Sequence, residues 1–554
     1  MTEPIRRLPD PIAGPDGKLI AKSALTPQAM KTRGAIAIPS TKVIPVIVVP
    51  GIMGSNLRIT KDTRVAIPED LDHGDPAWAP PNGTVAAGSQ VTIWAYRDAA
   101  QRQRILDGDY LEVDDEGKIE LPKNPQGMKA DQMRGRGWGE VHWDSYGGLL
   151  VDLHIKLATT YTKTISGQRE LAQHWQTVMK YNRDRWNAAD MAPLSEQELA
   201  KFAQFQYPVY ACGYNWVKSN EDSANRLKKR IFDIIEFWTQ RQFDCKQVIL
   251  VTHSMGGLVA RACAKQIQDR ILGIVHGVMP ALGAPLAYRR MACGVENWAP
   301  NKTSDIGMKG FATIAGRTPE LSTPAMATAG GALELLPNHL YPSPWLFATY
   351  RSRFNEHQDL THLQHENVYD MYRDFSAWFA PINVSLADPA GKYRTREGGV
   401  KGAIAKAVDQ AEKFHRTLLD TYYHPNTYAY YGADPNQWSF GTFRWVTSAP
   451  DSQKPEVRAV LPAGVWQAQP GSEGRSVSIP TFSFLQGVLP MQFFPGSQDA
   501  PGDGTVSHQS GDGPQGKIRR IFRTAGYDHQ GSYKNVHMLF LTHHLIVKIV
   551  QEAR

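Results

Sequence analysis

The stretch VILVTHSMGGLVARACAK at residues 248–265 constrains the fold more than any other part of this 554-residue chain. A short aliphatic run ends at Ser254, which stands among small residues, and the pattern of an amphipathic helix follows at once. A continuous apolar run of this length is typical of a strand that is buried on both faces of a parallel sheet. The stretch therefore predicts a buried strand, a tight turn at Ser254 and a helix after Gly256.

The same alternation recurs along the chain. The sequence predicts strands at residues 42–57, 207–216, 271–285, 426–434 and 517–526, and a final amphipathic helix from about residue 535. A further helix is predicted at residues 219–241, where Ser219 and Asn220 suit the N-cap. Strands that alternate with helices are what a mainly parallel sheet with covering helices requires. We therefore expect an α/β fold.

The patterns also divide the chain into core and insertions. Residues 1–40, rich in Pro, Gly and Lys, are expected to form a flexible N-terminal arm before one domain at 41–554. The core of that domain is expected at about 41–60, 206–285 and 424–554. The segments at about 60–205 and 286–424 have no core pattern, and we expect them to form a cap; one helix is predicted near 168–188.

Ser254 is the candidate nucleophile. It is predicted at the carboxyl end of a parallel strand, where open α/β sheets place their sites. Residues two before and two after such a serine crowd each other, so both are usually glycine, in the pattern G-x-S-x-G. Gly256 fits this pattern, but Thr252 replaces the first glycine. Because the backbone strain lies mainly at the serine, we expect the turn to persist, with Thr252 packed against neighbouring strands at the cost of some local strain.

A serine nucleophile needs a histidine base and an acid that orients it. His529 is the candidate base, because it lies between the last predicted strand and the final helix. Asp503, in the loop DAPGDGTVSHQSGDGP, is the candidate acid, with Asp499 as the alternative. A loop with three aspartates also suggests calcium, but the spacing does not match a calcium-binding loop. The histidines at 537, 543 and 544 lie inside the final helix and are expected to pack or to face water.

The developing oxyanion needs backbone donors. Met255 follows the serine at the start of its helix, whose dipole favours negative charge. Ile52 follows the Pro50–Gly51 turn after the first predicted strand, and Met53 is the alternative. Four residues elsewhere resemble metal ligands but match no zinc motif, namely His357, His362, His365 and Glu366. We therefore expect neither a metal nor a cofactor.

Composition narrows the class of protein. The net charge of +7 is dispersed, without the long basic runs of nucleic-acid-binding tails, so we expect no nucleic-acid partner. The N-terminus has no apolar segment of a secretory signal peptide. Four cysteines without a C-x-x-C pair favour a reducing compartment. We expect cytoplasmic synthesis, and any export would use a route other than Sec.

The motifs VIVVPGIMGSNL, YACGYNWVKSNEDSANRLKKRI, HSMGGLVARA, LGAP, YGAD and GDGTV stand in this order before His529 and a C-terminal helix. In these motifs the chain resembles the lecithin:cholesterol acyltransferase-like branch of α/β-hydrolase lipases and the related GPI inositol-deacylase-like lipases. In general build it is also similar to phospholipase effectors of type VI secretion systems. Thr252 departs from the family pattern, and the disulfides of the secreted acyltransferases have no counterpart.

The resemblance implies an α/β-hydrolase fold with large cap insertions and a triad of Ser254, Asp503 and His529. It also implies a lipid or phospholipid substrate met at a transient membrane surface and, for an effector, an immunity protein or a secretion-system component as partner. We expect a serine ester hydrolase with lipase or phospholipase A-type activity, acting as a secreted antibacterial effector. Two alternatives remain: an acyltransferase or soluble-ester esterase with the same triad, and an inactive hydrolase fold that serves as a binding module.

Overall fold

A computed structural model of the chain describes residues 40–554 apart from 81, 83, 124–127, 164–168, 298–305, 469–470 and 482–486. Before residue 40 it describes only four short strands, β1 (Ile5–Arg7), β2 (Ile12–Ala13), β3 (Leu19–Ile20) and β4 (Arg33–Ala35). Strand β1 pairs with β4, and β2 pairs with β3. The rest of the expected N-terminal arm lies outside the described residues.

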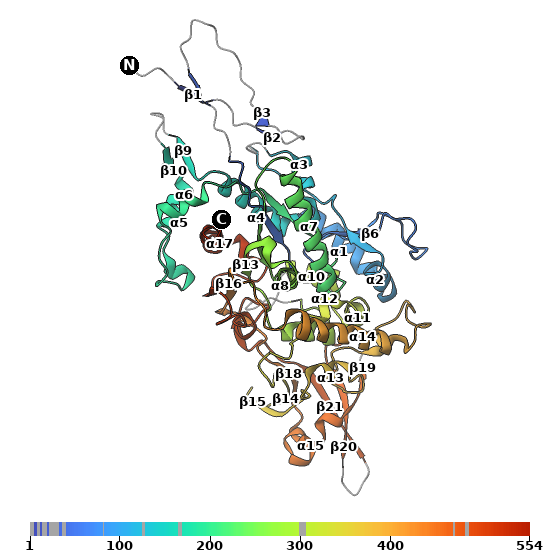
Figure 1. Cartoon of the computed structure of the whole chain (residues 1–554). Helices are drawn as coiled ribbons and strands as arrows, with labels where there is room; N and C mark the ends of the chain where they lie inside the picture. The colour runs from blue at the N-terminus through green and yellow to red at the C-terminus, as the bar shows by residue number, and fades with distance from the viewer. Residues whose placement is uncertain are drawn as a thin grey trace.

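A parallel sheet forms the centre of the molecule (Figure 1). Its strands lie in the order β11 (Val209–Ala211), β5 (Val46–Val49), β12 (Val248–His253), β13 (Ile271–Gly277), β16 (Thr427–Gly432) and β23 (Arg520–Thr524), and each pairs in parallel with its neighbour. Every residue of β5, β12 and β13 is buried, which explains their continuous apolar runs. The predicted mainly parallel α/β fold is confirmed.

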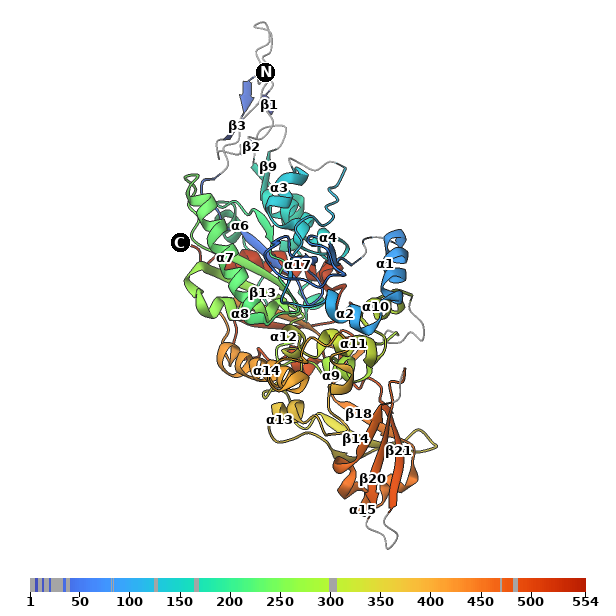
Figure 2. The same ribbon diagram turned by 90° about the vertical axis from the view of Figure 1, so that its right-hand side faces the viewer.

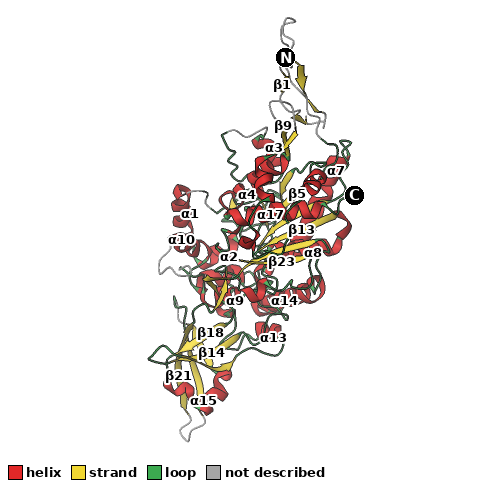
Figure 3. Ribbon diagram, turned by 90° about the vertical axis from the view of Figure 1, so that its left-hand side faces the viewer, coloured by secondary structure: helices red, strands yellow, loops and turns green. Residues whose placement is uncertain are grey.

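Alternate residues of β12 face opposite sides of the sheet, as the two-residue period of a strand requires. Val248 and Leu250 pack in one cluster with the helices α7 (Asn220–Thr239) and α8 (Gly256–Gln266). Ile249 and Val251 pack in a second cluster with α4 (Trp143–Ala158) and α17 (Val536–Val550). Figure 3 shows the strands of the sheet between these helices. Both faces are therefore covered, as a parallel sheet needs.

The predicted N-cap of α7 is present, because the Ser219 hydroxyl accepts a hydrogen bond from the amide of Glu221 at 3.1 Å. The final helix α17 begins in the same way after Asn535, whose side chain accepts from the amide of His537 at 2.8 Å. Both helices start where the sequence predicts them. Among the described helices, none combines the length and the hydropathy needed to cross a membrane.

Residues 60–205 lie partly on the central sheet. Helices α4, α5 (Gln173–Met179) and α6 (Glu196–Phe202) share the apolar cluster of α17 through Leu150, Trp175 and Leu199. The other elements of this region are β6 (Leu57–Ile59), β7 (Pro76–Trp78), α1 (Thr84–Tyr96), α2 (Ala99–Ile105), β8 (Leu111–Val113), α3 (Ala130–Gly135), β9 (Tyr161–Lys163) and β10 (Arg169–Leu171). The helix predicted near 168–188 corresponds to α5, which is shorter.

A second, mixed sheet projects from the body of the molecule (Figure 2). Its order is β15 (His357–His362), β14 (Leu346–Arg351), β18 (Phe443–Thr447), β21 (Gly487–Pro495), β20 (Arg475–Thr481) and β19 (Val465–Ala468). Between β13 and α17 the structure describes the helices α9 (Pro285–Cys293), α10 (Ile306–Ala315), α11 (Pro319–Met326), α12 (Gly330–Leu333), α13 (Val368–Arg373), α14 (Gly399–Lys413), α15 (Pro455–Val460) and α16 (His508–Gly511). The sequence does not predict this sheet.

The chain leaves and re-enters the central sheet at one place. After β16, strand β17 (Asp434–Ser439) pairs with β22 (Ala500–Gly502), so the ends of the long excursion lie side by side. Gly432, the last residue of β16, is close to Asp503: a Cβ at position 432 would lie 2.7 Å from the Cβ of Asp503. The excursion thereby returns Asp503 to the carboxyl end of the central sheet.

Candidate active site

Ser254 lies in a strained turn between β12 and α8. Its φ of 52° is in the left-handed region, which non-glycine residues rarely adopt. Its amide donates to the carbonyl of Gly277 at 3.0 Å, which ties the turn to the end of β13. Backbone strain of this kind collects at functional sites because the surrounding structure enforces it. The turn has the strand–serine–helix geometry that the sequence predicts.

Close packing explains which neighbours of the serine must be small. A Cβ at Gly256 would lie 2.3 Å from the carbonyl oxygen of Pro50, so no side chain fits there. Thr252 lies inside β12, and its hydroxyl forms a 2.8 Å hydrogen bond with Nδ1 of His276 on β13. Burial lowers the pKa of His276 to about 3, so this partner is neutral. Thr252 is packed against the neighbouring strand as expected, and the positive φ in the turn falls on Ser254 instead.

The structure brings Ser254, His529 and Asp503 together. Nε2 of His529 lies 2.8 Å from Oγ of Ser254, and Nδ1 lies 2.8 Å from Oδ2 of Asp503. The carboxylate is buried, and its Oδ1 accepts from the amides of Thr505 at 3.0 Å and Val506 at 2.8 Å. With Nδ1–H donating to the carboxylate, Nε2 is left to accept the serine proton.

The alternative candidates lie elsewhere. Asp499 accepts from the amide of Gly441 at 2.8 Å and pairs with Arg444 at 2.5 Å, which fixes the connection between β17 and β18. His543 faces Asp152 of α4 at 2.8 Å, and His537 contacts Tyr181. Within the described residues, no group of three or more His, Cys, Asp or Glu side chains is placed to hold a metal ion.

The two candidate oxyanion donors stand on either side of the serine. Gly51 lies against Ser254, since a Cβ at position 51 would be 2.9 Å from the serine Cβ and 3.4 Å from its Oγ. Ile52 is the next residue, and Met255 follows the serine at the N-cap of α8. Among the described residues, neither amide has a hydrogen-bond acceptor. Two free amides beside a nucleophile suit a developing oxyanion.

Three aromatic side chains hold the oxyanion turn, defined here as residues 50–54. The Tyr214 hydroxyl donates to the carbonyl of Pro50 at 2.8 Å, and Nε1 of Trp78 donates to the carbonyl of Met53 at 2.9 Å. The amide of Gly51 donates to the Tyr146 hydroxyl at 2.9 Å. The sequence interpretation missed these residues, because their spacing carries no signal and two of them lie in the segment assigned to the cap.

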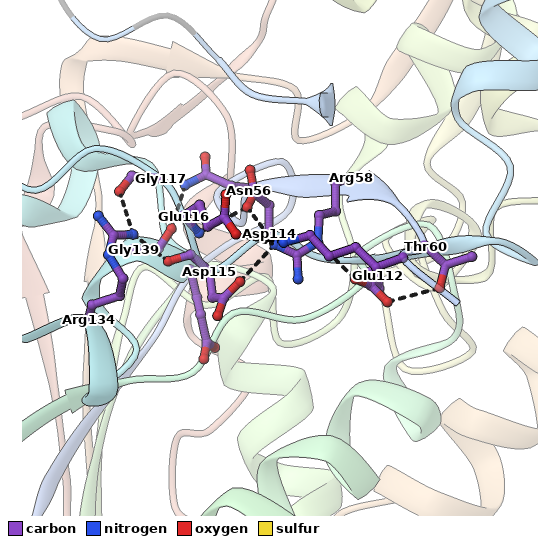
Figure 4. Close-up of polar contacts among 12 residues, drawn as sticks. Asn56, Arg58, Thr60, Glu112, Asp114, Asp115, Glu116, Gly117, Arg134 and Gly139 are labelled. Carbon is purple, nitrogen blue, oxygen red and sulfur yellow. Dashed lines mark hydrogen bonds and ion pairs between the residues drawn. The ribbon is translucent and has the colours of Figure 1, made fainter. Parts of the chain in front are cut away.

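Charged contacts fix the chain just beyond this turn (Figure 4). Arg58 of β6 pairs with Glu112 at 2.8 Å, Asp114 at 3.1 Å and Asp115 at 2.7 Å on and after β8. The side-chain amide of Asn56 donates to the carbonyl of Gly139 at 2.9 Å. The ion pairs tie β6 to β8, and the Asn56 contact ties the residue before β6 to Gly139. Together they anchor the oxyanion turn on its C-terminal side.

Comparisons with known proteins agree with this architecture. A family model described as the PGAP1-like alpha/beta domain matches residues 206–296, from β11 through the serine turn into α9. A chain of the crystal structure of the Tle4–Tli4 complex matches with a TM-score of 0.73 and 27% identity, over 92% of this chain and 99% of that chain. The comparison with curated proteins gives no match. The chain therefore has an α/β-hydrolase fold, and the resemblance predicted from its motifs is confirmed.

Proposed function

We propose that this chain is a serine ester hydrolase that cleaves acyl esters of lipids, with lipase or phospholipase A-type activity. The observation that carries the proposal is the continuous contact from Ser254 Oγ through the His529 ring to Asp503, with both distances at 2.8 Å. The match to the PGAP1-like alpha/beta domain includes the serine but not the other two residues. The proposed roles of His529 and Asp503 rest on the two 2.8 Å contacts.

The geometry supports a two-step acyl transfer. The Oγ of Ser254 attacks the ester carbonyl while Nε2 of His529 takes the serine proton. The carboxylate of Asp503 stabilises the imidazolium that forms. The amides of Ile52 and Met255 stabilise the oxyanion of the tetrahedral intermediate. His529 then protonates the leaving alcohol, and the acyl-enzyme is hydrolysed by water, which His529 activates in the same way.

Apolar side chains beside the oxyanion turn support a lipid substrate. Met53 packs against a small apolar cluster of Val295, Ala312 and Ala315, the last two on α10. Ile52 and Met53 also pack against the main apolar cluster of the fold. Ile52 and Met53 themselves are partly exposed. An acyl chain bound next to the serine would replace water on these two side chains, which is favourable. The chain would then contact a membrane surface only transiently, while it takes up a lipid substrate.

A protein partner is also part of the proposal. The similar chain comes from a complex of two proteins, Tle4 and Tli4, and the likeness extends over nearly all of both chains. This supports a protein partner of the immunity type for the present chain. We propose in addition that the chain acts as an antibacterial effector and is exported by a route other than Sec. Co-purification of the chain with the product of a neighbouring gene, compared with an unrelated protein as bait, would test the partner.

The activity is tested with purified wild-type chain and Ser254→Ala on phospholipid vesicles, triglyceride emulsions and p-nitrophenyl esters, followed by lipid mass spectrometry. Ser452→Ala is the matched control, because Ser452 is buried and bonds only to a backbone carbonyl remote from the site. Fatty acid release by wild type and Ser452→Ala, but not by Ser254→Ala, is expected. Equal release by all three would overturn the serine mechanism.

The same assay separates the alternatives. A labelled alcohol acceptor that becomes acylated would identify an acyltransferase, and cleavage confined to p-nitrophenyl esters would identify a soluble-ester esterase. No turnover of any substrate by wild type would favour a binding module.

A further inference from the structure

We propose that Tyr146 and His253 are positioning residues, which hold the oxyanion turn in a fixed place relative to His529. The proposal rests on the ester hydrolysis proposed above and assigns a function to two residues outside the triad. Tyr146 lies on α4, and His253 is the last residue of β12, directly before the nucleophile.

Three hydrogen bonds connect the oxyanion turn to the loop that carries His529. The Gly51 amide lies 2.9 Å from the Tyr146 hydroxyl, and this hydroxyl lies 2.9 Å from Nδ1 of His253. Nε2 of His253 lies 3.0 Å from the backbone carbonyl of His529. The contacts join four segments that are distant in sequence, namely the end of β5, helix α4, the end of β12 and the loop after β23.

Only one placement of the hydrogens satisfies all three contacts. The His529 carbonyl can only accept, so Nε2 of His253 carries the hydrogen, and Nδ1 of the neutral ring accepts. The Tyr146 hydroxyl must then donate to Nδ1 and accept from the Gly51 amide. Each donor has one acceptor, so the network has a definite direction from the oxyanion turn to His529.

Burial keeps this arrangement in one protonation state. Tyr146 and His253 are 2% and 3% exposed. Burial, with a smaller contribution from His529, lowers the pKa of His253 to about 3, so the ring is neutral at physiological pH. Burial also raises the pKa of the Tyr146 phenol, which therefore keeps its proton. Neither group changes its hydrogen bonding in the pH range in which an ester hydrolase with a histidine base works.

The orientation of the Ile52 amide follows from these contacts. The peptide between Pro50 and Gly51 is held at both ends, by Tyr214 at its carbonyl and by Tyr146 at its amide. The next carbonyl, that of Gly51, accepts from the Gly54 amide at 3.1 Å. Because the C=O and N–H of a trans peptide point in opposite directions, this contact turns the Ile52 amide away from Gly54. Loss of the Tyr146 hydroxyl would release the first of these peptides and let the donor drift.

The role is distinct from core packing. Tyr146 and His253 act on the reaction through Gly51 and His529, and a contribution to packing alone would change stability and leave turnover of the folded protein intact. A shift of the oxyanion donor changes the stabilisation of the transition state and not the binding of the ground state. Turnover number and stability therefore have to be measured on the same variants.

The experiment compares Tyr146→Phe, His253→Phe and the double variant with wild type, by kcat and KM for a short p-nitrophenyl ester and by thermal unfolding. Tyr372→Phe is the matched control, since the buried Tyr372 hydroxyl donates to the carbonyl of Pro337 at 2.6 Å, outside the site. We expect both single variants to lower kcat by about 10- to 100-fold with KM near the wild-type value. The double variant should lose no more kcat than the more strongly impaired of the two single variants, because both changes break one network.

Two further measurements sharpen the test. His253→Gln keeps a donor near the His529 carbonyl and should recover part of the activity that His253→Phe loses. Affinity for a trifluoromethyl ketone, which forms an oxyanion on Ser254, should fall by the same factor as kcat. A wild-type kcat in Tyr146→Phe, or an equal loss of kcat in Tyr372→Phe, would overturn the positioning role. If Ser254→Ala releases as much product as wild type, the proposed function itself fails and the positioning role fails with it.

Discussion

Replacement of Gly51 by alanine tests how closely the oxyanion turn approaches the nucleophile. The added Cβ would lie 2.9 Å from the Cβ of Ser254 and 3.0 Å from Nδ1 of His253. The turn must therefore move by about 0.5 Å before the first of these contacts reaches 3.4 Å, the lower limit of ordinary contact. Gly51 is not among the residues with positive φ, so alanine adds no backbone strain there. Any change in kcat would therefore come from the steric clash of the added Cβ with Ser254 and His253.

A displacement of this size moves the Ile52 amide away from the oxyanion. Since a misplacement of about 1 Å can cost about 100-fold in rate, we expect Gly51→Ala to lower kcat by about 10- to 100-fold, or about 1.4–2.7 kcal/mol of transition-state stabilisation. The assay is p-nitrophenyl ester turnover, with circular dichroism to verify the fold. Gly148→Ala on the exposed face of α4 is the control, because its Cβ would meet nothing within 4 Å. A wild-type kcat in Gly51→Ala would show that the oxyanion turn can move away from Ser254 without loss of transition-state stabilisation.

Three other changes have defined outcomes. Thr252→Val removes the hydroxyl that bonds to buried His276 and should lower the free energy of unfolding by about 1–3 kcal/mol, measured by urea denaturation; an unchanged urea midpoint would show that the bond contributes nothing. Asp503→Asn should lower kcat by about 10⁴-fold while Asp499→Asn, which affects only the contacts with Arg444 and its neighbours, retains the wild-type kcat; a reversed order of the two variants would identify Asp499 as the acid. Burial raises the pKa of Glu334 from 4.5 to about 8, so the unfolded chain releases this proton at lower pH than the native chain, and wild type should lose stability as the pH rises from about 5 to about 8. Glu334→Gln should remove this slope, and parallel pH profiles of urea midpoints would contradict the assignment.

The central sheet and the serine turn follow from local sequence patterns. The strands that became β5, β12 and β13 are buried on both faces, so their sequences are continuously apolar and their ends are marked by glycine and proline. The helix α7 carries its own N-cap at Ser219. His529 is predicted from its place between the last strand and the final helix, and Asp503 from its glycine-rich loop. In the structure Nδ1 of His529 lies 2.8 Å from Asp503, and Nε2 lies 2.8 Å from Ser254.

The second sheet and the supports of the oxyanion turn lack such local patterns. Strands β14 and β18 are parallel neighbours although almost a hundred residues separate them, and pairing of this kind is not encoded in either segment alone. Tyr146 reaches Gly51 from 95 positions along the chain. Its hydroxyl acquires a role only when α4 lies on the sheet, which depends on the packing of leucines such as Leu149 and Leu150 in the tertiary structure.

The place of Tyr146 on α4 limits how this protein can be recombined with its relatives. A chimera that exchanges residues 60–205 as one cap would also exchange the side chain that holds the Gly51 amide. Grafts that aim to transfer substrate preference should therefore leave α4 with the recipient and change only the segments around it. Homologous scaffolds that place a tyrosine at the same point of the helix would accept such grafts, and those that lack it would need Tyr146 to be introduced together with His253.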